Sequence, residues 1–477
     1  MKRFKIHISI LLLLHLFCGC KKFVELDAPK TQLVTNNVFA SDETASAALL
    51  GIYAQMVDND FTPYKIANYT GLAADELITY TTVNLLVYQN SLRPSDAVTN
   101  SIWTNAYSFI YQANAVYEGC NNSTTLSTAA KKQIMAEAIF LRSYWYFYLI
   151  NLYGDVPLLL TSDYTKNATI GKTSQNDIYN QISNDLKSAE NDLSENYVGA
   201  NSISTGTERI RANKYAAAAL LARVYLYQKK YPDAEAQATI VLNNKTLYDL
   251  VDLTQVFLKN TKENILQIPK PSPTNNFNTY EGSYFILTSK PGDNFINSSV
   301  ISDRLMYAFD SADKRKSAWV GTFTDNSVTP SVNYNYPYKY KAFNTATISE
   351  YSTVLRVGEQ YLIRAEARAN QSNLSGAISD IDMIRNRAGL PLIANTNPGI
   401  NQTDLITAIL KERQVELFAE WGHRWMDLKR TGNINSVMSV VTPAKGGPAW
   451  NSNMQLWPIP QTDIATNPNL KQNQGYN

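Results

Sequence analysis

Histidine is scarce in this chain of 477 residues, which contains three. Two of them, His7 and His15, lie in an N-terminal segment that is typical of a cleaved signal, so His423 is the one left in the mature chain. A histidine-based metal site needs several such ligands, and no cysteine cluster replaces them, so we expect no bound metal. Catalysis by a Ser–His–Asp arrangement could use only His423, for which we expect a buried structural role.

Cysteine is equally scarce, and one of the three is predicted to carry lipid. Residues 1–19 start with the basic stretch MKRFK and continue into an apolar run too short to span a membrane, as in a secretory signal peptide. Gly19 precedes Cys20 as in a lipobox, so we expect acylation of Cys20 and a tether over residues 20–37; the alternative is an ordinary signal cleaved nearby. Cys120 is then the other mature cysteine, which excludes an intramolecular disulfide.

Neither sign of charge is in excess. Of the 43 lysines and arginines three lie in the signal, which leaves 40 against 41 aspartates and glutamates. This balance offers no basic footprint for nucleic acid. The sequence also lacks a phosphate-binding loop and a dinucleotide fingerprint, so we expect no cofactor.

What the sequence does contain is a series of amphipathic helices. Alanine-rich helices are predicted in pairs, at 213–228 with 233–242 and at 357–369 with 374–387. Such pairs are typical of tetratricopeptide repeats, in which stacking buries faces that no single pair can bury. We therefore predict a mostly α fold, an α–α superhelix of tetratricopeptide-like pairs, as one domain over 38–477. Further helices are expected at 41–56, 102–117, 129–153 and 174–193.

A segment of different character, about 252–350, interrupts the helical pattern. Six prolines fall among many asparagines, serines, threonines and tyrosines, so we predict an irregular, loop-rich insertion between the third and fourth helix pairs. The alternating tyrosines from Tyr334 to Tyr340 would share one face of a strand, which Pro337 limits to an edge, and we favour packing over ligand contact for them. Residues 61–100 also lack clear periodicity and are predicted to be loops and short turns.

The stretch Leu405–Arg430 is predicted to be the most strongly specified helix, with one mostly apolar stripe. Glu412, Glu416 and Glu420 form a second stripe, four residues apart. Three carboxylates in a row repel one another unless cations neutralise them. We therefore expect all three to be paired, with the lysines and arginines of the same stretch as the nearest candidates.

This stretch resembles a signature of the SusD/RagB family of outer-membrane nutrient-binding lipoproteins, which typically reads ERRxEFxxEGHRWxDLxR. Matching positions are held by Glu412–Arg413, Glu416, Glu420, Gly422–Trp425 and Asp427–Leu428, with Trp421 as a small difference. Four further stretches resemble the family, at 136–157, 220–242, 356–390 and 457–476. The resemblance therefore spans nearly the whole chain.

The resemblance implies non-catalytic capture of an oligosaccharide or polysaccharide nutrient at the outer membrane and its delivery to a TonB-dependent, SusC-like transporter barrel. It also implies a lipid anchor at Cys20 and exposure at the cell surface. In such proteins the ligand lies near loops that here are 71–100 and 277–319, where aromatic rings can stack on sugars and polar side chains can bind hydroxyls. The expected ligand-binding residues are Asp75, Tyr80, Asn84, Tyr88, Arg93, Tyr280, Tyr284 and Trp319.

Three other functions stay open from the residues. One is binding of a peptide or another nutrient, a function that the resemblance to the family also allows. Another is a structural lid that gates the barrel without holding ligand. The third is a glycosidase, which needs only two carboxylates; Asp75 with Glu76 is the most tempting pair, although these residues could simply cap a following helix.

Overall fold

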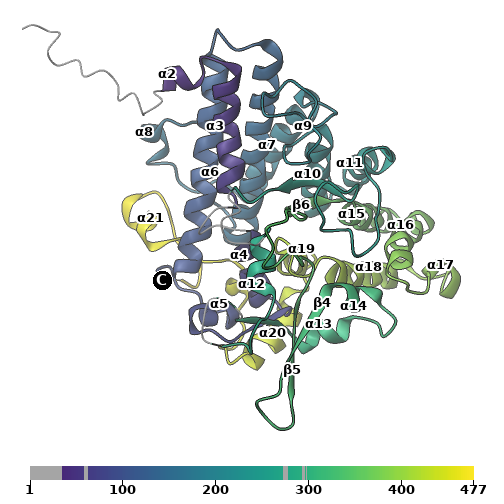
Figure 1. Cartoon of the computed structure of the whole chain (residues 1–477). Coiled ribbons are helices and arrows are strands. Elements are labelled where there is room, and N and C mark those ends of the chain that lie inside the picture. Colours follow the sequence, from purple (N-terminus) through teal and green to yellow (C-terminus); the bar gives the residue numbers. More distant parts are fainter. Residues whose placement is uncertain (1–34, 58–62, 272–277, 293–295, 297, 477) are drawn as a thin grey trace, which may run out of the picture.

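Helices make up most of the structure, a computed structural model that describes residues 35–57, 63–271, 278–292, 296 and 298–476 (Figure 1). The mostly α prediction is confirmed. The predicted signal at 1–19, Cys20 and nearly all of the tether lie outside the described residues. No helix in the described part of the chain is long and apolar enough to cross a membrane.

The N-terminal half is built on three long helices, α3 (Asp42–Gln55), α6 (Ala97–Asn122) and α7 (Thr128–Tyr153). Each predicted helix is present. Ser41 caps α3 by accepting the backbone N–H of Thr44, and Ser127 caps α7 in the same way. From Ala136 onward α7 is buried on every side because both α6 and α9 (Gln175–Asp192) pack against it.

The two predicted helix pairs are confirmed as α10 (Lys214–Tyr227) with α11 (Tyr231–Asn243) and α15 (Val357–Asn370) with α16 (Leu374–Arg387). Each helix packs on the next from α6 through α7, α9, α10, α11 and α15 to α16. Small alanine side chains, fully buried in α10 and α15, allow this close approach. Successive pairs thus form the superhelix that Figure 1 shows running from the long helices towards α16.

The insertion leaves this superhelix after α11 and returns at α15, although α11 and α15 pack directly on each other. Its two ends are joined, because β2 (Asn264–Ile268) pairs antiparallel with β6 (Ser352–Arg356). A hairpin of β4 (Val320–Asp325) and β5 (Val332–Pro337) projects from the body, and the predicted strand ends at Pro337. The insertion is more regular than predicted, with α12 (Tyr280–Phe285), α13 (Asp303–Ala308) and α14 (Lys314–Trp319).

The prediction of loops over 61–100 is wrong at its start, where α4 (Pro63–Ala73) is a helix. Every residue of α4 except Lys65 is buried, so no polar face marks its periodicity in the sequence. Short elements follow it, namely β1 (Leu77–Thr79), η3 (Thr82–Asn84) and α5 (Leu85–Tyr88).

The single helix predicted over Leu405–Arg430 is two helices, α18 (Gln402–Glu416) and α19 (His423–Arg430). The turn between them takes left-handed backbone angles at Ala419, Trp421 and Gly422, with φ of 53°, 45° and 80°. The turn buries the Trp421 indole, whose Nε1 donates to the carbonyl of Thr353 at 2.7 Å. The remaining described helices are α2 (Thr35–Val38), α8 (Tyr164–Asn167), α17 (Ile393–Thr396), α20 (Ile434–Ala444), η4 (Ser452–Gln455) and α21 (Gln461–Thr466).

The three glutamates of this stretch are buried and paired, as predicted. Their partners are not those expected, because they come from other elements: Arg315, Lys339, Arg356, Arg385 and Arg387. Arg413 and Arg430 instead bind Asp427 of α19. Arg413 reaches it because the turn folds α19 back towards α18, and Arg430 because it lies three residues further along α19. The resulting buried network ties the insertion, α15 and α16 to α18.

His423 is buried in α19, as predicted, with Nδ1 4.0 Å from a carboxylate oxygen of Glu359. Burial and the neighbouring guanidinium of Arg223 lower the pKa of His423 well below its usual value. The imidazole is therefore neutral at physiological pH.

Candidate ligand-binding surface

Two segments far apart in the sequence meet where β1 pairs antiparallel with β3 (Ser299–Ile301). Beyond the ladder, the N–H of Tyr80 donates to the carbonyl of Ser298 at 2.7 Å. At its other end the N–H of Ser302 donates to the carbonyl of Glu76 at 2.8 Å. Residues 71–100 and the insertion, which the resemblance implies as ligand loops, therefore lie side by side.

The first tyrosine group comprises Tyr80, Tyr88 and Tyr334. The Tyr80 side chain is 41% exposed and meets Tyr334 of β5 edge-to-face, with ring centroids 5.7 Å apart. Tyr88 is partly buried, and the Nζ atom of Lys445 lies 5.0 Å from its ring centroid. Partial burial, and next the neighbouring Tyr334 hydroxyl, raise the pKa of Tyr80, so the Tyr80 hydroxyl is neutral at physiological pH.

The second tyrosine group comprises Tyr64, Tyr280 and Tyr284, from α4 and α12. The ring of Tyr284 stacks on Tyr64 with centroids 4.8 Å apart and on Tyr280 with centroids 6.1 Å apart. Tyr280 and Tyr284 are partly exposed, while Tyr64 is buried beneath them. The Tyr64 hydroxyl contacts Ser298, the residue whose carbonyl binds Tyr80, so the two groups flank the start of β3.

Three of the predicted site residues have side chains that face the interior. Asp75 is buried and receives two hydrogen bonds from Arg424 of α19, at 2.7 and 2.8 Å. Trp319 is fully buried, with its Nε1 donating to the carbonyl of Leu253 at 2.9 Å. Asn84 is buried in η3. Direct contact with a ligand would require these side chains to leave their present surroundings.

Asp75 and Glu76 form an unequal pair of carboxylic acids. Burial alone would raise the pKa of Asp75, but the Arg424 guanidinium holds this pKa below its usual value. Burial and the charge of Asp75 raise the pKa of Glu76 to about 8. Both residues are enclosed, and β1 rather than a helix follows them, so they do not cap a helix.

Arg93 is exposed, and its backbone contacts link it to α6 and α21. Its backbone N–H donates to the Oδ2 atom of Asp96 at 2.6 Å, in the turn before α6. The adjacent Pro94 carbonyl accepts the N–H of Gln461, which begins α21. These contacts place the Arg93 turn beside α21.

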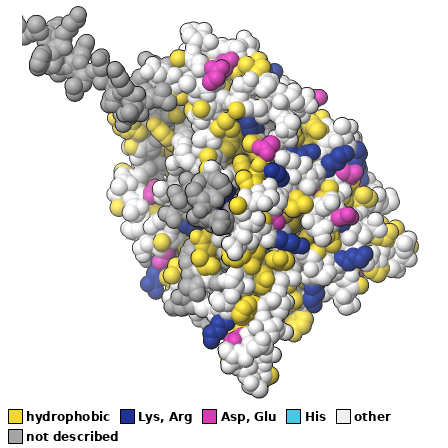
Figure 2. Space-filling view, viewed as in Figure 1, with side chains coloured by type: hydrophobic (Ala, Val, Ile, Leu, Met, Phe, Trp, Pro, Cys, Tyr) yellow, Lys and Arg dark blue, Asp and Glu magenta, His cyan; other side chains and the backbone are white. Residues whose placement is uncertain are grey.

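Sequence reasoning missed two contributors to this surface. Tyr64 lies in α4, within the segment predicted to be loops, and Tyr334 is one of the tyrosines for which the sequence favours packing. The alternation of tyrosines in β5 is the signal that could have identified Tyr334, since it sets one ring beside Tyr80. Packing is confirmed for Tyr340, which is buried. On the face shown in Figure 2, hydrophobic side chains occur in several patches, with lysines and arginines scattered between them.

The superhelix of helix pairs with an inserted layer of short strands and loops defines a class of α-helical proteins with a tetratricopeptide-like scaffold. Two family models match the chain: one described as the SusD family over residues 290–476, the other as starch-binding associating with outer membrane over residues 22–226. The chain belongs to the SusD family, in agreement with the signature at 412–428.

Two curated relatives and a solved structure are similar to this chain along nearly their whole lengths. SusD-like protein P2 of Formosa agariphila is 27% identical, with 100% of both chains covered, and SusD-like protein P25 of the same organism is 22% identical, with 96% of each covered. A SusD superfamily protein from Bacteroides vulgatus has a TM-score of 0.76 at 20% identity, covering 91% of this chain and 99% of its own.

Two further neighbours cover the same shares of both chains. One is named a laminarin binding SusD-like protein and has a TM-score of 0.73 at 20% identity. The other is surface glycan-binding protein A from Bacteroides uniformis, with a TM-score of 0.75 at 18% identity. At these identities the likeness establishes the shared fold.

Proposed function

We propose that this protein binds a glycan without cleaving it, through the surface formed by the two tyrosine groups. The observation that carries the proposal is the pairing of β1 with β3, which sets partly exposed rings from both groups on either side of one strand. Family membership and the names of two structural neighbours, a laminarin binding SusD-like protein and a surface glycan-binding protein, support it.

The chemistry of the rings suits a sugar. A flat ring presents an apolar face to the C–H face of a pyranose, and a phenolic hydroxyl can donate to or accept from its hydroxyls. Covering one exposed tyrosine face buries enough apolar area to contribute about 1–2 kcal/mol, which corresponds to roughly 5- to 30-fold in Kd. Tyr80, Tyr88, Tyr280 and Tyr284 are the proposed contacts, while Asp75, Asn84 and Trp319 hold the surrounding backbone.

The proposed location is the outer membrane, with the chain anchored by lipid on Cys20 and facing the cell exterior. The Gly19–Cys20 pair and the description of one matching family as associated with the outer membrane support this placement. Cys20→Ala should move the protein from the membrane fraction to the soluble fraction, and added protease should cut the native protein on intact cells. Recovery of Cys20→Ala in the membrane fraction would count against the anchor.

The proposed partner is a TonB-dependent, SusC-like transporter barrel that receives the glycan. This partner follows from the family and not from a particular surface of the molecule. Purification of the native lipoprotein from mild detergent should recover such a barrel in equal amounts. Recovery of the lipoprotein alone under several detergents would argue against a stable complex.

Electrophoresis of the chain from Lys21 through gels that each contain one polysaccharide tests glycan binding. We expect retardation in at least one gel, and loss of retardation in the double variant Tyr80→Ala, Tyr284→Ala. The matched control is Tyr164→Ala, which removes a 78% exposed ring on α8. Equal retardation of the double variant would show that glycan binds elsewhere. Free migration of the unmodified chain in every gel would favour capture of a peptide or another nutrient.

A further inference from the structure

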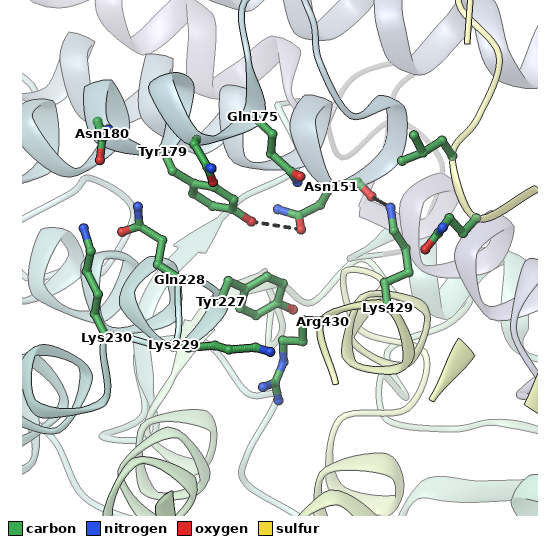
Figure 3. A pocket seen from close by; sticks show the side chains of 13 residues that line it. Asn151, Gln175, Tyr179, Asn180, Tyr227, Gln228, Lys229, Lys230, Lys429 and Arg430 are labelled. Carbon is green, nitrogen blue, oxygen red and sulfur yellow. Dashed lines mark hydrogen bonds between the residues drawn. The ribbon is translucent and has the colours of Figure 1, made fainter. Parts of the chain in front are cut away.

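A second cavity lies away from the tyrosine groups, between the C-terminal end of α7, α9, the turn from α10 to α11, and α19 (Figure 3). Its volume is about 670 Å³, which is room for one or two sugar units. None of its lining residues belongs to the proposed glycan surface.

The lining is rich in cations and amides and contains no carboxylate among the described residues. Arg430 is neutralised, because it bonds to Glu366 and Asp427 outside the lining. Lys229, Lys230 and Lys429 have no ion pair within the described part of the chain. The cavity therefore carries positive charge that the protein itself does not balance.

Tyr227 supplies an unused hydrogen-bonding group. Its side chain is only 8% exposed, and its hydroxyl finds no hydrogen-bond partner among the described residues. Figure 3 shows the ring at the cavity with Lys229 and Arg430 on one side and Tyr179 on the other. A buried hydroxyl without a partner costs about 1–3 kcal/mol. The hydroxyl is enclosed beside the cavity, so a ligand would satisfy it after a shift of the Tyr227 ring.

Lys429 is the most deeply set of the three lysines, and its Nζ atom donates to the backbone carbonyl of Asn151. Burial lowers the pKa of Lys429 to about 7, and no carboxylate offsets this effect. An anion in the cavity would favour the charged ammonium. The Asn151 amide oxygen accepts from the Tyr179 hydroxyl at 3.1 Å, which fixes both side chains at the wall.

We propose that this cavity binds a sugar unit carrying one anionic group, either a carboxylate or a sulfate ester, with Tyr227 and Lys429 as direct contacts. The amide side chains and tyrosine hydroxyls offer donors and acceptors for sugar hydroxyls, while the lysines balance the anion. The choice of a sugar rests on the proposed function; the anion preference stands on the cavity alone.

Calorimetric titration of the chain from Lys21 tests the proposal with two acidic probes, digalacturonate and galactose 6-sulfate. The neutral counterparts are galactobiose and galactose. We expect at least one acidic probe to bind at least tenfold more tightly than its counterpart, and the stronger of the two identifies the anionic group. Tyr227→Phe and Lys429→Gln should each weaken that binding about tenfold.

The matched control is Lys132→Gln, an exposed lysine near the opposite end of α7, which should change nothing. Tyr227→Phe removes a buried hydroxyl that has no partner, so the variant should unfold at the same temperature as the unmodified chain or at a higher one, and weaker binding could not then be explained by a loss of stability. Absence of binding by both acidic probes at millimolar concentration would overturn the proposal, as would binding that neither variant weakens. Inorganic sulfate binding as tightly as the acidic sugars would overturn the sugar assignment.

The two sites can fail separately. The double variant Tyr80→Ala, Tyr284→Ala should leave binding of the acidic probe unchanged, and Tyr227→Phe should leave gel retardation by a neutral polysaccharide unchanged. Loss of acidic binding in the tyrosine-group variant would place the probe there and refute the second site.

Discussion

Replacing Glu416 with glutamine removes one charge from the centre of the buried network while nearly preserving the shape of the side chain. Glu416 is fully buried, and its carboxylate accepts from Arg315 at 3.0 Å, Arg356 at 2.7 Å and Arg387 at 2.5 Å. Burial alone would raise the pKa of Glu416, but the guanidiniums hold this pKa far below its usual value. The Glu416 carboxylate is therefore charged at neutral pH.

The size of the effect follows from the partners that stay behind. Removing one member of a buried ion pair costs about 3–5 kcal/mol, because a charge is left without a counter-ion. Here each arginine keeps another carboxylate: Asp313 and Glu412 for Arg315, Glu263 and Glu420 for Arg356, and Glu263 for Arg387. We therefore expect the lower end, about 3 kcal/mol.

Thermal and urea unfolding at pH 7 measure this loss. With an unfolding entropy of about 2.1 cal/mol/K per residue, a chain of this length should unfold about 3 °C lower. Glu416→Leu should be worse than Glu416→Gln, since leucine offers the arginines no acceptor. Glu195→Gln, in an exposed pair with Lys214, is the control and should change stability by less than about 0.5 kcal/mol. An equally small change for Glu416→Gln would refute the reasoning.

Two further substitutions test local features. Glu76 has a folded-state pKa of about 8, above its unfolded value. Its contribution to stability is therefore present at low pH and is lost as pH rises from about 4.5 towards 8. Glu76→Gln should flatten the plot of unfolding free energy against pH over that window, and an unchanged plot would contradict the raised pKa of Glu76. Gly422 has a φ of 80°, and an added Cβ would lie 2.9 Å from the Thr70 hydroxyl. Gly422→Ala should therefore lower the free energy of unfolding, measured in urea, by more than about 1 kcal/mol. The control Gly432→Ala has a similar φ of 77° but open space around it, and it should cost less.

The helix pairs could be predicted from the sequence because their signals are local. Buried alanines recur with helical spacing in α10 and α15, and polar residues such as Ser41 sit at the starts of helices. The prediction failed at the turn between α18 and α19, because the helical spacing of the glutamates continues past the end of α18. Glu420 keeps the four-residue interval from Glu416 although α18 ends at Glu416 and Glu420 lies in the turn, and only Gly422 hints at the change of direction.

The candidate surface could be predicted only in part. Composition identified tyrosines in two segments, but their meeting depends on β1 and β3, strands of three residues that are too short to leave a pattern. Burial of Asp75 depends on Arg424, about 350 residues later, and Trp319 is held by a backbone carbonyl of Leu253. Such long-range contacts are not encoded in local spacing.

The antiparallel pairing of β2 with β6 affects how the insertion can vary in evolution. Because the insertion starts and ends at neighbouring points, lengthening it costs little: doubling a closed loop adds only about 0.6 kcal/mol of chain entropy. Tyr280 and Tyr284 belong to this replaceable segment, whereas Tyr80 follows a backbone that Asp75 locks to α19. At the proposed glycan surface, ligand preference can therefore evolve by exchange of one side while the other side stays fixed.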